Sequence, residues 1–314
     1  MNISKKIKSF FFLLITGSTL VIILSFNNTK DISFLPYDSD YVQASSVTHD
    51  GEQYKVVWMK RSGKRVRAKY FAFKTNGEEI YERYNKWKIG KDIILYTSGT
   101  YMDISFDAKT AKLKGLTVDN GKVVNQSLAK QDGKNIMDGL VIVYPHGGIA
   151  VSNLEEGNLK LSGGGANPNK FYDLRGSSDD RYLFKSWAQS EKATVFQTHL
   201  LAWKDKLLFD YNYKTKSHPR ERRFLAIGYG PNGETIHCIV HKPKNATLYD
   251  ASNKVLKFLN ERKGMEVLAL LNLDTGIQDI FKLFTKSGAE NGMIKSANDQ
   301  TIYNARNLLA YYFE

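Results

Sequence analysis

The run Met265-Glu-Val-Leu-Ala-Leu-Leu-Asn-Leu-Asp274-Thr-Gly276 joins an apolar stretch without turn residues to an acidic turn. An apolar stretch of this kind predicts a buried strand. Because the strand stops in Asp-Thr-Gly, it brings a carboxylate to the rim of a sheet, where glycine lets the backbone approach a ligand closely. Asp274 is therefore the first candidate for chemistry, with a turn-capping aspartate as the alternative.

A helix is expected just upstream of this strand. Apolar residues recur at helical spacing from Ala251 to Glu261, behind Asp250 or Ser252 as possible caps. Lys263-Gly264 closes the pattern. Two further helices are expected, from Asp180 to Gln189 and from Gly276 to Lys286.

Short apolar segments alternate with Gly, Asn and Asp turns through most of the chain from residue 90 onward. Asn120-Gly121 is the strongest hairpin signal, and Gly230-Pro-Asn-Gly233 is a second one. Tyr54 to Phe73 predicts two strands around a Ser-Gly turn. The expected fold class is α+β: mainly antiparallel sheet with a few packed helices, in a single exported domain behind an N-terminal membrane segment.

The N-terminus predicts export. Lys5, Lys6 and Lys8 precede the uncharged stretch from Ser9 to Phe26, whose length is at the lower edge for a membrane span and above that of a signal-peptide core. The basic flank predicts a cytoplasmic N-terminus and an exported remainder. Residues 1–26 are interpreted as an uncleaved signal anchor of a single-pass membrane protein. A cleaved signal peptide on a secreted protein is the alternative.

Residues 27–46 are polar, contain Pro36, and are interpreted as a linker before one domain at residues 47–314. Cys238 is the only cysteine, so no intrachain disulfide is possible. Export without disulfides is ordinary in bacteria, which favours a bacterial envelope protein in the periplasm or another extracytoplasmic space.

The formal net charge of +13 suits an anionic partner. No aromatic-basic repeat or zinc-finger pattern is present, so nucleic acid is not expected. We expect an anionic envelope glycan or a sugar phosphodiester as partner, and membrane contact through the N-terminal segment. A basic protein without any anionic partner is the alternative, and the oligomeric state stays open.

Metal and cofactor signals are weak. His237 and His241 lie in a segment that reads as a strand, where their spacing separates the Cα atoms by roughly 13 Å, too far to share one ion. Ser162-Gly-Gly-Gly165 lacks the Lys-Ser/Thr of a phosphate-binding loop. We expect neither a metal nor a cofactor.

Loop-end features follow one another in a characteristic order. They are Thr97–Met102, Gly115–Asn125, Phe196–Leu201, Arg220–Gly228 and Leu273–Gly276. In order and approximate spacing they resemble the phosphodiester glycosidase family, the uncovering-enzyme-like hydrolases that release N-acetylglucosamine from a phosphodiester. The resemblance covers about residues 90 to 314.

The resemblance implies a hydrolase that cleaves glycosyl phosphodiesters. Asp274 would serve as acid, base or nucleophile, and Arg222 or Arg223 would grip the phosphate oxygens. The remaining candidates would bind and orient the substrate: Ser98, Gly99, Tyr101, Gln197, His199 and Gly276.

The sequence also departs from the family pattern. Asn-Gly-Gly-Phe-Phe of the family corresponds here to Ser98-Gly-Thr-Tyr-Met102, and its Asp-Gly-Gly-Gly-Ser corresponds to Asp274-Thr-Gly-Ile-Gln278. The β-branched Thr100 and Thr275 crowd positions that the family leaves open. These changes motivate the rival hypothesis, a non-catalytic member that binds envelope glycan at the membrane surface.

Overall fold

The computed structural model describes residues 32–33, 40–61, 65–73, 77–102, 112–129, 137–208, 218–276, 279–284 and 305–314. The expected membrane segment at residues 1–26 lies outside these ranges. Within them, no helix combines the length and the apolar character that crossing a membrane requires.

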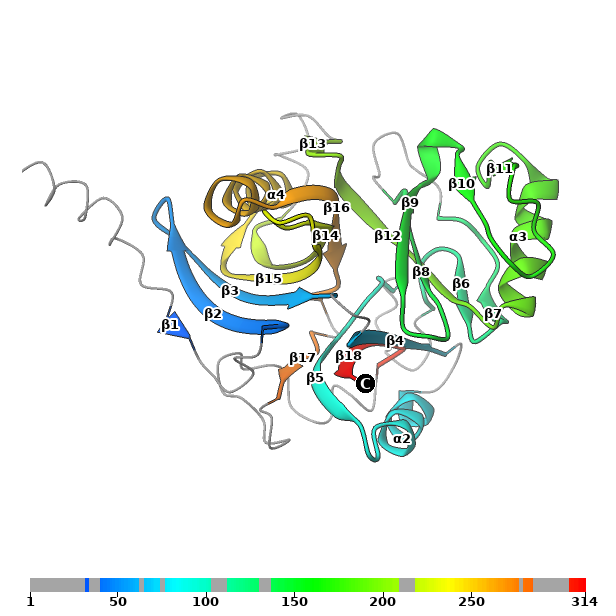
Figure 1. The fold of residues 1–314 in the computed structure, drawn as a ribbon, viewed down its shortest axis with the longest axis horizontal. Helices are drawn as coiled ribbons and strands as arrows, with labels where there is room; N and C mark the ends of the chain where they lie inside the picture. Colours follow the sequence, from blue (N-terminus) through cyan, green and yellow to red (C-terminus); the bar gives the residue numbers. More distant parts are fainter. Residues whose placement is uncertain are drawn as a thin grey trace, which may run out of the picture.

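The larger of two main sheets has 12 strands (Figure 1). They are β1 (Ile32–Ser33), β2 (Val42–His49), β3 (Glu52–Lys60), β6 (Thr117–Asp119), β7 (Lys122–Asn125), β8 (Gly139–Val143), β9 (Ile149–Asn153), β12 (Thr194–Trp203), β13 (Lys206–Leu207), β14 (Arg220–Tyr229), β15 (Thr235–Ala246) and β16 (Glu266–Leu273). The spatial order is β1-β2-β3-β15-β14-β16-β12-β6-β7; β13 and β8 also pair with β12, and β9 pairs with β8.

The smaller main sheet has four strands in the order β17-β5-β18-β4. These are β17 (Phe281–Leu283), β5 (Asp92–Thr97), β18 (Asn307–Phe313) and β4 (Val66–Ala72), and a separate ladder joins β10 (Leu159–Lys160) to β11 (Phe171–Tyr172). Each ladder within the described ranges is antiparallel. The expected α+β class, mainly antiparallel, is confirmed.

The described helices are α2 (Gly77–Trp87), the short 3-10 helix η2 (Leu154–Glu156), α3 (Ser178–Ser190), α4 (Leu248–Lys257) and the π-helical turn η4 (Phe258–Arg262). The side chains of Ser177 and Thr247 accept hydrogen bonds from backbone amides in the first turns of α3 and α4, as good N-caps do. These two helices confirm the helices expected at 180–189 and 251–261.

The core forms layers. One apolar cluster lies between the two main sheets and includes Val57, Leu225 and Leu271 from the larger sheet with Tyr70 and Leu309 from the smaller one. α4 covers the opposite face of the larger sheet, α2 covers the opposite face of the smaller sheet, and α3 packs against β8 and β12 (Figure 1). Each strand of the sheet centre is therefore buried on both faces, which explains its nearly continuous apolar sequence.

Some expected elements need correction. The helix expected from Gly276 to Lys286 is wrong in its described part, because Phe281 and Leu283 face the core on either side of Lys282, the two-residue period of strand β17. The segment expected as a linker contributes β1 and β2, and β2 pairs with β3 along its whole length.

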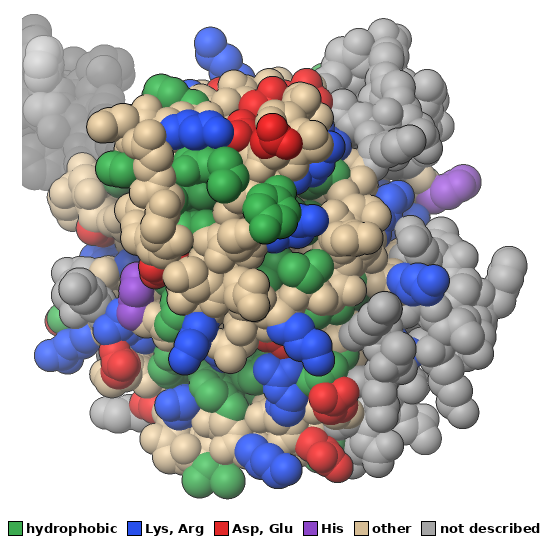
Figure 2. Space-filling model, turned by 90° about the vertical axis from the view of Figure 1, so that its right-hand side faces the viewer, with side chains coloured by type: hydrophobic (Ala, Val, Ile, Leu, Met, Phe, Trp, Pro, Cys, Tyr) green, Lys and Arg blue, Asp and Glu red, His purple; other side chains and the backbone are tan. Residues whose placement is uncertain are grey.

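The turns were predicted more accurately than the partners of the strands beside them. The Asn120-Gly121 hairpin is confirmed, with φ of 50° and 81°, and so is the hairpin at 230–233 between β14 and β15. The segments on either side of the Ser-Gly turn are strands β3 and β4, but they lie in different sheets. On the face that Figure 2 shows, lysine and arginine side chains are scattered among apolar and acidic ones.

Candidate active site

Asp274 lies where strand β16 ends. The preceding Leu273 pairs with Arg223 of β14, so the turn that follows begins at the edge of that ladder. The Asp274 amide donates to the carbonyl of Gly99 at 3.1 Å, and the Gly276 amide donates to Asp274 Oδ1 at 2.8 Å. The acidic turn is thus joined to the loop that follows β5.

The carboxyl group of Asp274 is buried, with 6% of the residue exposed. Burial raises its pKa from the usual 3.8 to about 6, although the Gly276 amide and the Arg223 guanidinium act in the opposite direction. A carboxyl group with a pKa near 6 exchanges a proton readily near neutral pH, which is the property that general acid-base catalysis requires.

Three side chains from different segments meet beside this turn. Asn272 of β16 pairs across the sheet with His199 of β12, and its side-chain amide donates to the hydroxyl of Tyr101. The Tyr101 ring lies 4.6 Å from the His199 ring, centroid to centroid. We call these three residues, together with Asp274 two positions after Asn272, the strand-end cluster.

Two buried atoms of the strand-end cluster, His199 Nδ1 and Asn272 Oδ1, have no hydrogen-bond partner. Burial, with the nearby charges of Lys114 and Arg222, lowers the pKa of His199 to about 3, so its imidazole is neutral at physiological pH. An unpaired acceptor and an unpaired ring nitrogen are costly to bury, and a bound ligand would satisfy them.

Cationic side chains surround the strand-end cluster. Lys114 and Arg222 act on His199, and Arg220 and Arg223 act on Asp274. The Arg222 side chain donates to the carbonyls of His218 at 2.7 Å and Ala246 at 3.2 Å, and its pKa is lowered by burial to about 10, so it stays charged. The environment suits a ligand with negative charge.

Arg223 is committed elsewhere. Its guanidinium forms an ion pair with Asp279 at 2.7 Å, donates to the carbonyl of Ile280 at 3.1 Å and lies over the Phe281 ring at 4.6 Å. It therefore fastens the segment after the acidic turn to β14. The expected phosphate grip by this arginine has no support in these contacts.

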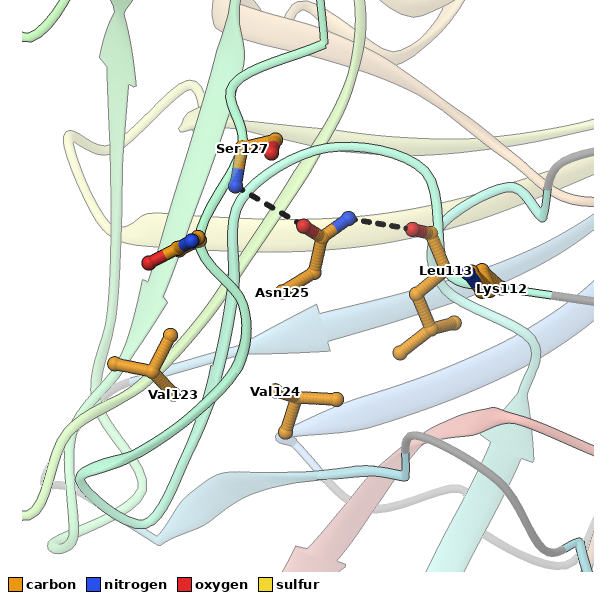
Figure 3. A pocket seen from close by; sticks show the side chains of 7 residues that line it. Lys112, Leu113, Val123, Val124, Asn125 and Ser127 are labelled. Atoms are coloured by element: carbon orange, nitrogen blue, oxygen red, sulfur yellow. Dashed lines mark hydrogen bonds between the residues drawn. The ribbon is translucent and has the colours of Figure 1, made fainter.

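A hollow of about 660 Å³ is lined by residues 112–113 and 123–127 (Figure 3). Its lining includes Lys112, Leu113 and Asn125, and Asn125 Nδ2 donates to the Leu113 carbonyl at 2.8 Å. The backbone at residue 114, next to this lining, is held against Tyr101, whose carbonyl accepts a hydrogen bond from the Lys114 amide at 2.8 Å.

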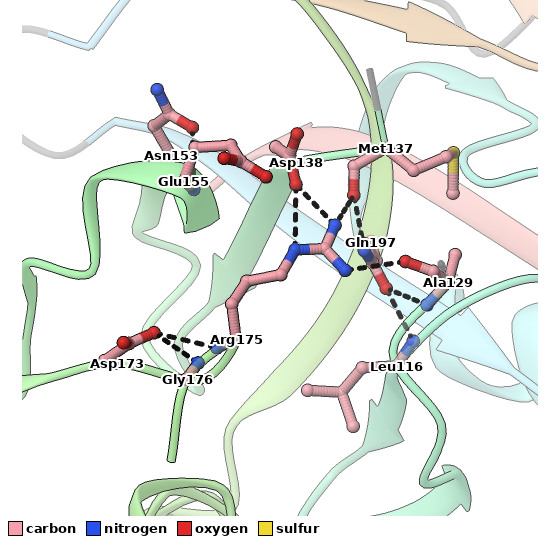
Figure 4. A network of polar contacts seen from close by, with 10 residues as sticks. All are labelled: Leu116, Ala129, Met137, Asp138, Asn153, Glu155, Asp173, Arg175, Gly176 and Gln197. Atoms are coloured by element: carbon pink, nitrogen blue, oxygen red, sulfur yellow. Dashed lines mark hydrogen bonds and ion pairs between the residues drawn. The ribbon is translucent and has the colours of Figure 1, made fainter. Parts of the chain in front are cut away.

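Gln197 is fully buried and has backbone partners at both ends of its amide (Figure 4). Its Oε1 accepts from the amides of Leu116 at 3.1 Å and Ala129 at 2.9 Å, and its Nε2 donates to the Met137 carbonyl. Arg175 binds the carbonyls of the same Ala129 and Met137. Gln197 thus holds loops in place, whereas the sequence suggested that it orients a substrate.

Ser98 and Gly99 stabilise the loop that follows β5. The Ser98 hydroxyl accepts from the Ile280 amide at 3.1 Å. The buried Asn307 of β18 clamps the next two residues: its Oδ1 accepts from Gly99 at 2.7 Å and from Thr100 at 3.1 Å, and its Nδ2 donates to the Thr100 carbonyl. A Cβ on Gly99 would lie 2.7 Å from the Tyr70 ring, so only glycine fits there.

His237 and His241 contact different neighbours. His237 Nδ1 is 3.1 Å from the Tyr311 hydroxyl across the two main sheets, and His241 lies beside Arg223 and Phe281. In the described ranges, no group of three or more His, Cys, Asp or Glu side chains is placed to hold a metal ion.

Sequence reasoning missed Asn272, Lys114, Arg220, Asp279 and Asn307. Asn272 had a readable signal, because it is a polar residue inside an apolar strand two positions before the candidate aspartate. Asn307 had none, since its importance depends on β18 lying next to β5.

No protein-family model and no curated protein matches this chain. Among solved structures, the catalytic domain of zebrafish N-acetylglucosamine-1-phosphodiester alpha-N-acetylglucosaminidase, auto-inhibited by its pro-peptide, is similar over 91% of this chain and 88% of that chain, at 14% identity and a TM-score of 0.47. A hypothetical protein from Synechocystis is similar over 87% of this chain and 62% of its own, at 10% identity and a TM-score of 0.41. A putative exported protein from Burkholderia pseudomallei covers 85% of this chain and 74% of its own, at 8% identity and a TM-score of 0.39. These values describe a distant structural relationship.

Proposed function

We propose that this chain hydrolyses glycosyl phosphodiesters in an anionic envelope glycan or glycolipid, on the outer side of the cytoplasmic membrane. The observation that carries the proposal is the strand-end cluster: a buried carboxyl group with its pKa near 6 at Asp274, and two residues before it an amide that binds the phenol packed on the neutral imidazole of His199, with basic side chains acting on both. The order of the sequence motifs agrees with it.

The proposed reaction breaks the bond between the anomeric carbon and the phosphate oxygen. Ionised Asp274 takes a proton from water as the water oxygen bonds to the anomeric carbon, and the phosphomonoester leaves with the bonding electron pair. A phosphomonoester has a second pKa near 6, so its departure needs cations more than a proton donor. Lys114 and Arg220 are the basic residues proposed to face it, with Arg222 supporting the positive potential.

The assay uses the full-length chain with a sugar 1-phosphodiester and measures the released sugar. Replacing Asp274→Asn should lower kcat by about 10² to 10⁴-fold, the usual contribution of a general base. Glu266→Gln is the matched control, because Glu266 is an exposed carboxylate at the opposite end of the same strand. Equal activity in Asp274→Asn and the control would remove Asp274 from the catalytic role.

One observation favours the non-catalytic alternative. Three side chains with expected substrate roles, Ser98, Gln197 and Arg223, are engaged within the protein. If the chain only binds glycan, it should retain an anionic oligosaccharide in a pull-down while releasing no sugar, and Asp274→Asn should leave that retention unchanged.

The extracytoplasmic location is part of the proposal and rests on the Lys-flanked apolar run at residues 5–26. Protease added to intact spheroplasts should digest the domain. Survival of the full-length chain under those conditions, with digestion only after lysis, would contradict this topology.

A further inference from the structure

A second hollow, of about 480 Å³, lies beside the β6–β7 hairpin and includes no residue of the strand-end cluster. Phe73 after β4, Arg83 of α2, Asp119 of β6 and Lys122, Val123 and Val124 of β7 contribute to its lining. Its volume falls in the range that small-molecule sites occupy, about 300 to 1,000 Å³.

Asp119 contributes to the lining of this hollow, and one of its carboxylate oxygens is buried without a hydrogen-bond partner. Only 6% of the residue is exposed. Its Oδ2 accepts from Arg83 Nη1 at 2.7 Å and from the Ala72 amide at 3.5 Å, whereas its buried Oδ1 has no hydrogen-bond partner. Leaving a buried acceptor without a donor is costly, so a ligand hydroxyl at this position would be stabilising.

The charges around Asp119 favour an anionic group over a cationic one. Lys122 and Arg83 line the hollow, and Lys69 interacts electrostatically with both Asp119 and Arg83. These three basic side chains stand against two acidic ones, Asp119 and Glu79. The surplus of positive charge repels an amine and attracts a carboxylate or phosphate.

The remaining wall is apolar. Phe73 is held under the Arg83 guanidinium at 4.4 Å, and Val123 and Val124 form the side provided by β7. Such a wall packs against the C–H face of a ring while polar groups at the rim bind its substituents.

We propose that this hollow binds a hydroxylated ring carrying an anionic group, the chemistry shared by sugar acids and sugar phosphates. A ring hydroxyl donates to the Asp119 carboxylate, the anionic substituent faces Arg83 and Lys122, and the ring packs on Val123 and Val124. This site is independent of hydrolysis by Asp274.

Calorimetric titration of the full-length chain at pH 7 tests this with four probes: glucuronate, glucose 6-phosphate, glucose and inorganic phosphate. At least one acidic sugar should bind about tenfold or more tightly than both glucose and phosphate, because it alone supplies hydroxyl and anion together. Comparing glucuronate with glucose 6-phosphate separates the two sources of the anion. Equal binding of phosphate and the acidic sugars, equal binding of glucose, or no binding of any probe at millimolar concentration would overturn the proposal.

Variants locate the binding. Asp119→Asn should weaken the acidic sugar about tenfold, and Lys122→Ala about fivefold. Lys206→Ala, an exposed lysine on β13, is the control and should change nothing. If loss of the Arg83 ion pair unfolds the Asp119→Asn variant, the affinity of Lys122→Ala tests the site by itself, because Lys122 is exposed on edge strand β7. Unchanged affinity in Lys122→Ala would then reject this hollow as the site. Asp274→Asn should bind the probes as the unmodified chain does.

Discussion

Neighbouring arginines on β14 illustrate how strongly a residue's role depends on the side of the strand from which it projects. Arg223 shares its parity with Leu225 and Ile227, which belong to the core between the two main sheets, and there it pairs with Asp279. Arg220 is exposed and acts on Asp274 through space. The sequence run Arg220-Glu-Arg-Arg223 looks uniform, but its members differ in burial and in partners.

This difference predicts different phenotypes for Arg223→Ala and Arg220→Ala. Arg223→Ala should lower the free energy of unfolding by about 2 to 4 kcal/mol, because a buried ion pair and its hydrogen bonds are lost. Arg220→Ala should leave stability nearly unchanged and raise KM for an anionic substrate. Urea unfolding and steady-state kinetics on both variants provide the check, and the reverse pattern would contradict the assignment.

The raised pKa of Asp274 predicts the pH dependence of hydrolysis. If Asp274 acts as base, only its ionised form is active, so kcat/KM should rise with pH through an apparent pKa of about 6 and then level off. Arg220 lowers this pKa, so Arg220→Ala should move the rising limb to higher pH. A rate that falls as pH rises through 6 would instead assign Asp274 the role of acid.

At the scale of elements, α4 is fastened to the β2–β3 hairpin by ion pairs. Glu52 of β3 accepts from Lys242 Nζ at 2.7 Å and from Lys254 Nζ of α4, while Asp50 accepts from Lys257 Nζ at 2.7 Å. Hydrogen bonds from the two lysines lower the pKa of Glu52 from 4.5 to about 2. Lys242 is nearly fully buried, so this pairing compensates a charge that would otherwise be isolated.

The depressed pKa of Glu52 gives a prediction for acid stability. Its contribution is fully present above the unfolded pKa of about 4.5 and is lost as pH falls toward 2. Glu52→Gln should therefore lower the free energy of unfolding at pH 7 by about 1 to 2 kcal/mol, the full shift being reduced by solvent screening, and should weaken the loss of stability between pH 4.5 and 2. Guanidinium unfolding from pH 7 to pH 3 measures both effects. Asp50→Asn is the exposed control and should change little, so equal losses in the two variants would contradict a special role for Glu52.

At the scale of the whole molecule, buried histidines connect the layers. His237 meets Tyr311 across the two main sheets, His241 lies beside Arg223, and His199 belongs to the strand-end cluster. Burial lowers the pKa of His199 and of His241 to about 3 and that of His237 well below 6.5. All three are neutral in the folded protein and become protonated on unfolding in mild acid.

This predicts early acid unfolding. Below pH 6.5 the unfolded chain binds protons at three histidines that the folded chain does not, while folded Asp274, with its raised pKa, binds one that the unfolded chain releases. The unfolded chain therefore binds more protons than the folded one in mild acid, so the free energy of unfolding should fall as pH drops below about 6.5. Urea unfolding at pH 7, 6 and 5 measures the slope. His237→Gln should make the slope shallower, because one of these histidines is then absent from the unfolded chain, and a flat profile in the unmodified chain would contradict the account.

Local patterns predicted local structure well. Asn120-Gly121 adopts the positive φ values that its turn type requires, and the apolar run before Asp274 is strand β16. α2 was not predicted, because few of its residues are buried, Ile80 and Tyr84 among them, and the rest of its sequence is polar. β17 was mistaken for a helix because a strand of three residues is too short to display its period.

What the sequence determined by itself was the type of several elements, among them β16, α3, α4 and two hairpin turns, because turn chemistry and apolar periodicity act over a few neighbouring residues. It also singled out Tyr101 and His199, whose rings lie 4.6 Å apart, and the buried Asp274 at the end of β16. Only the tertiary structure decided that Arg223 and Gln197 are internal supports, that Asn307 clamps the loop before Tyr101, and that Asp119 has an unsatisfied oxygen. The physical reason is that each of these roles depends on a hydrogen-bond partner distant in sequence, or on its absence, and the packing of the sheets and helices decides which polar groups meet.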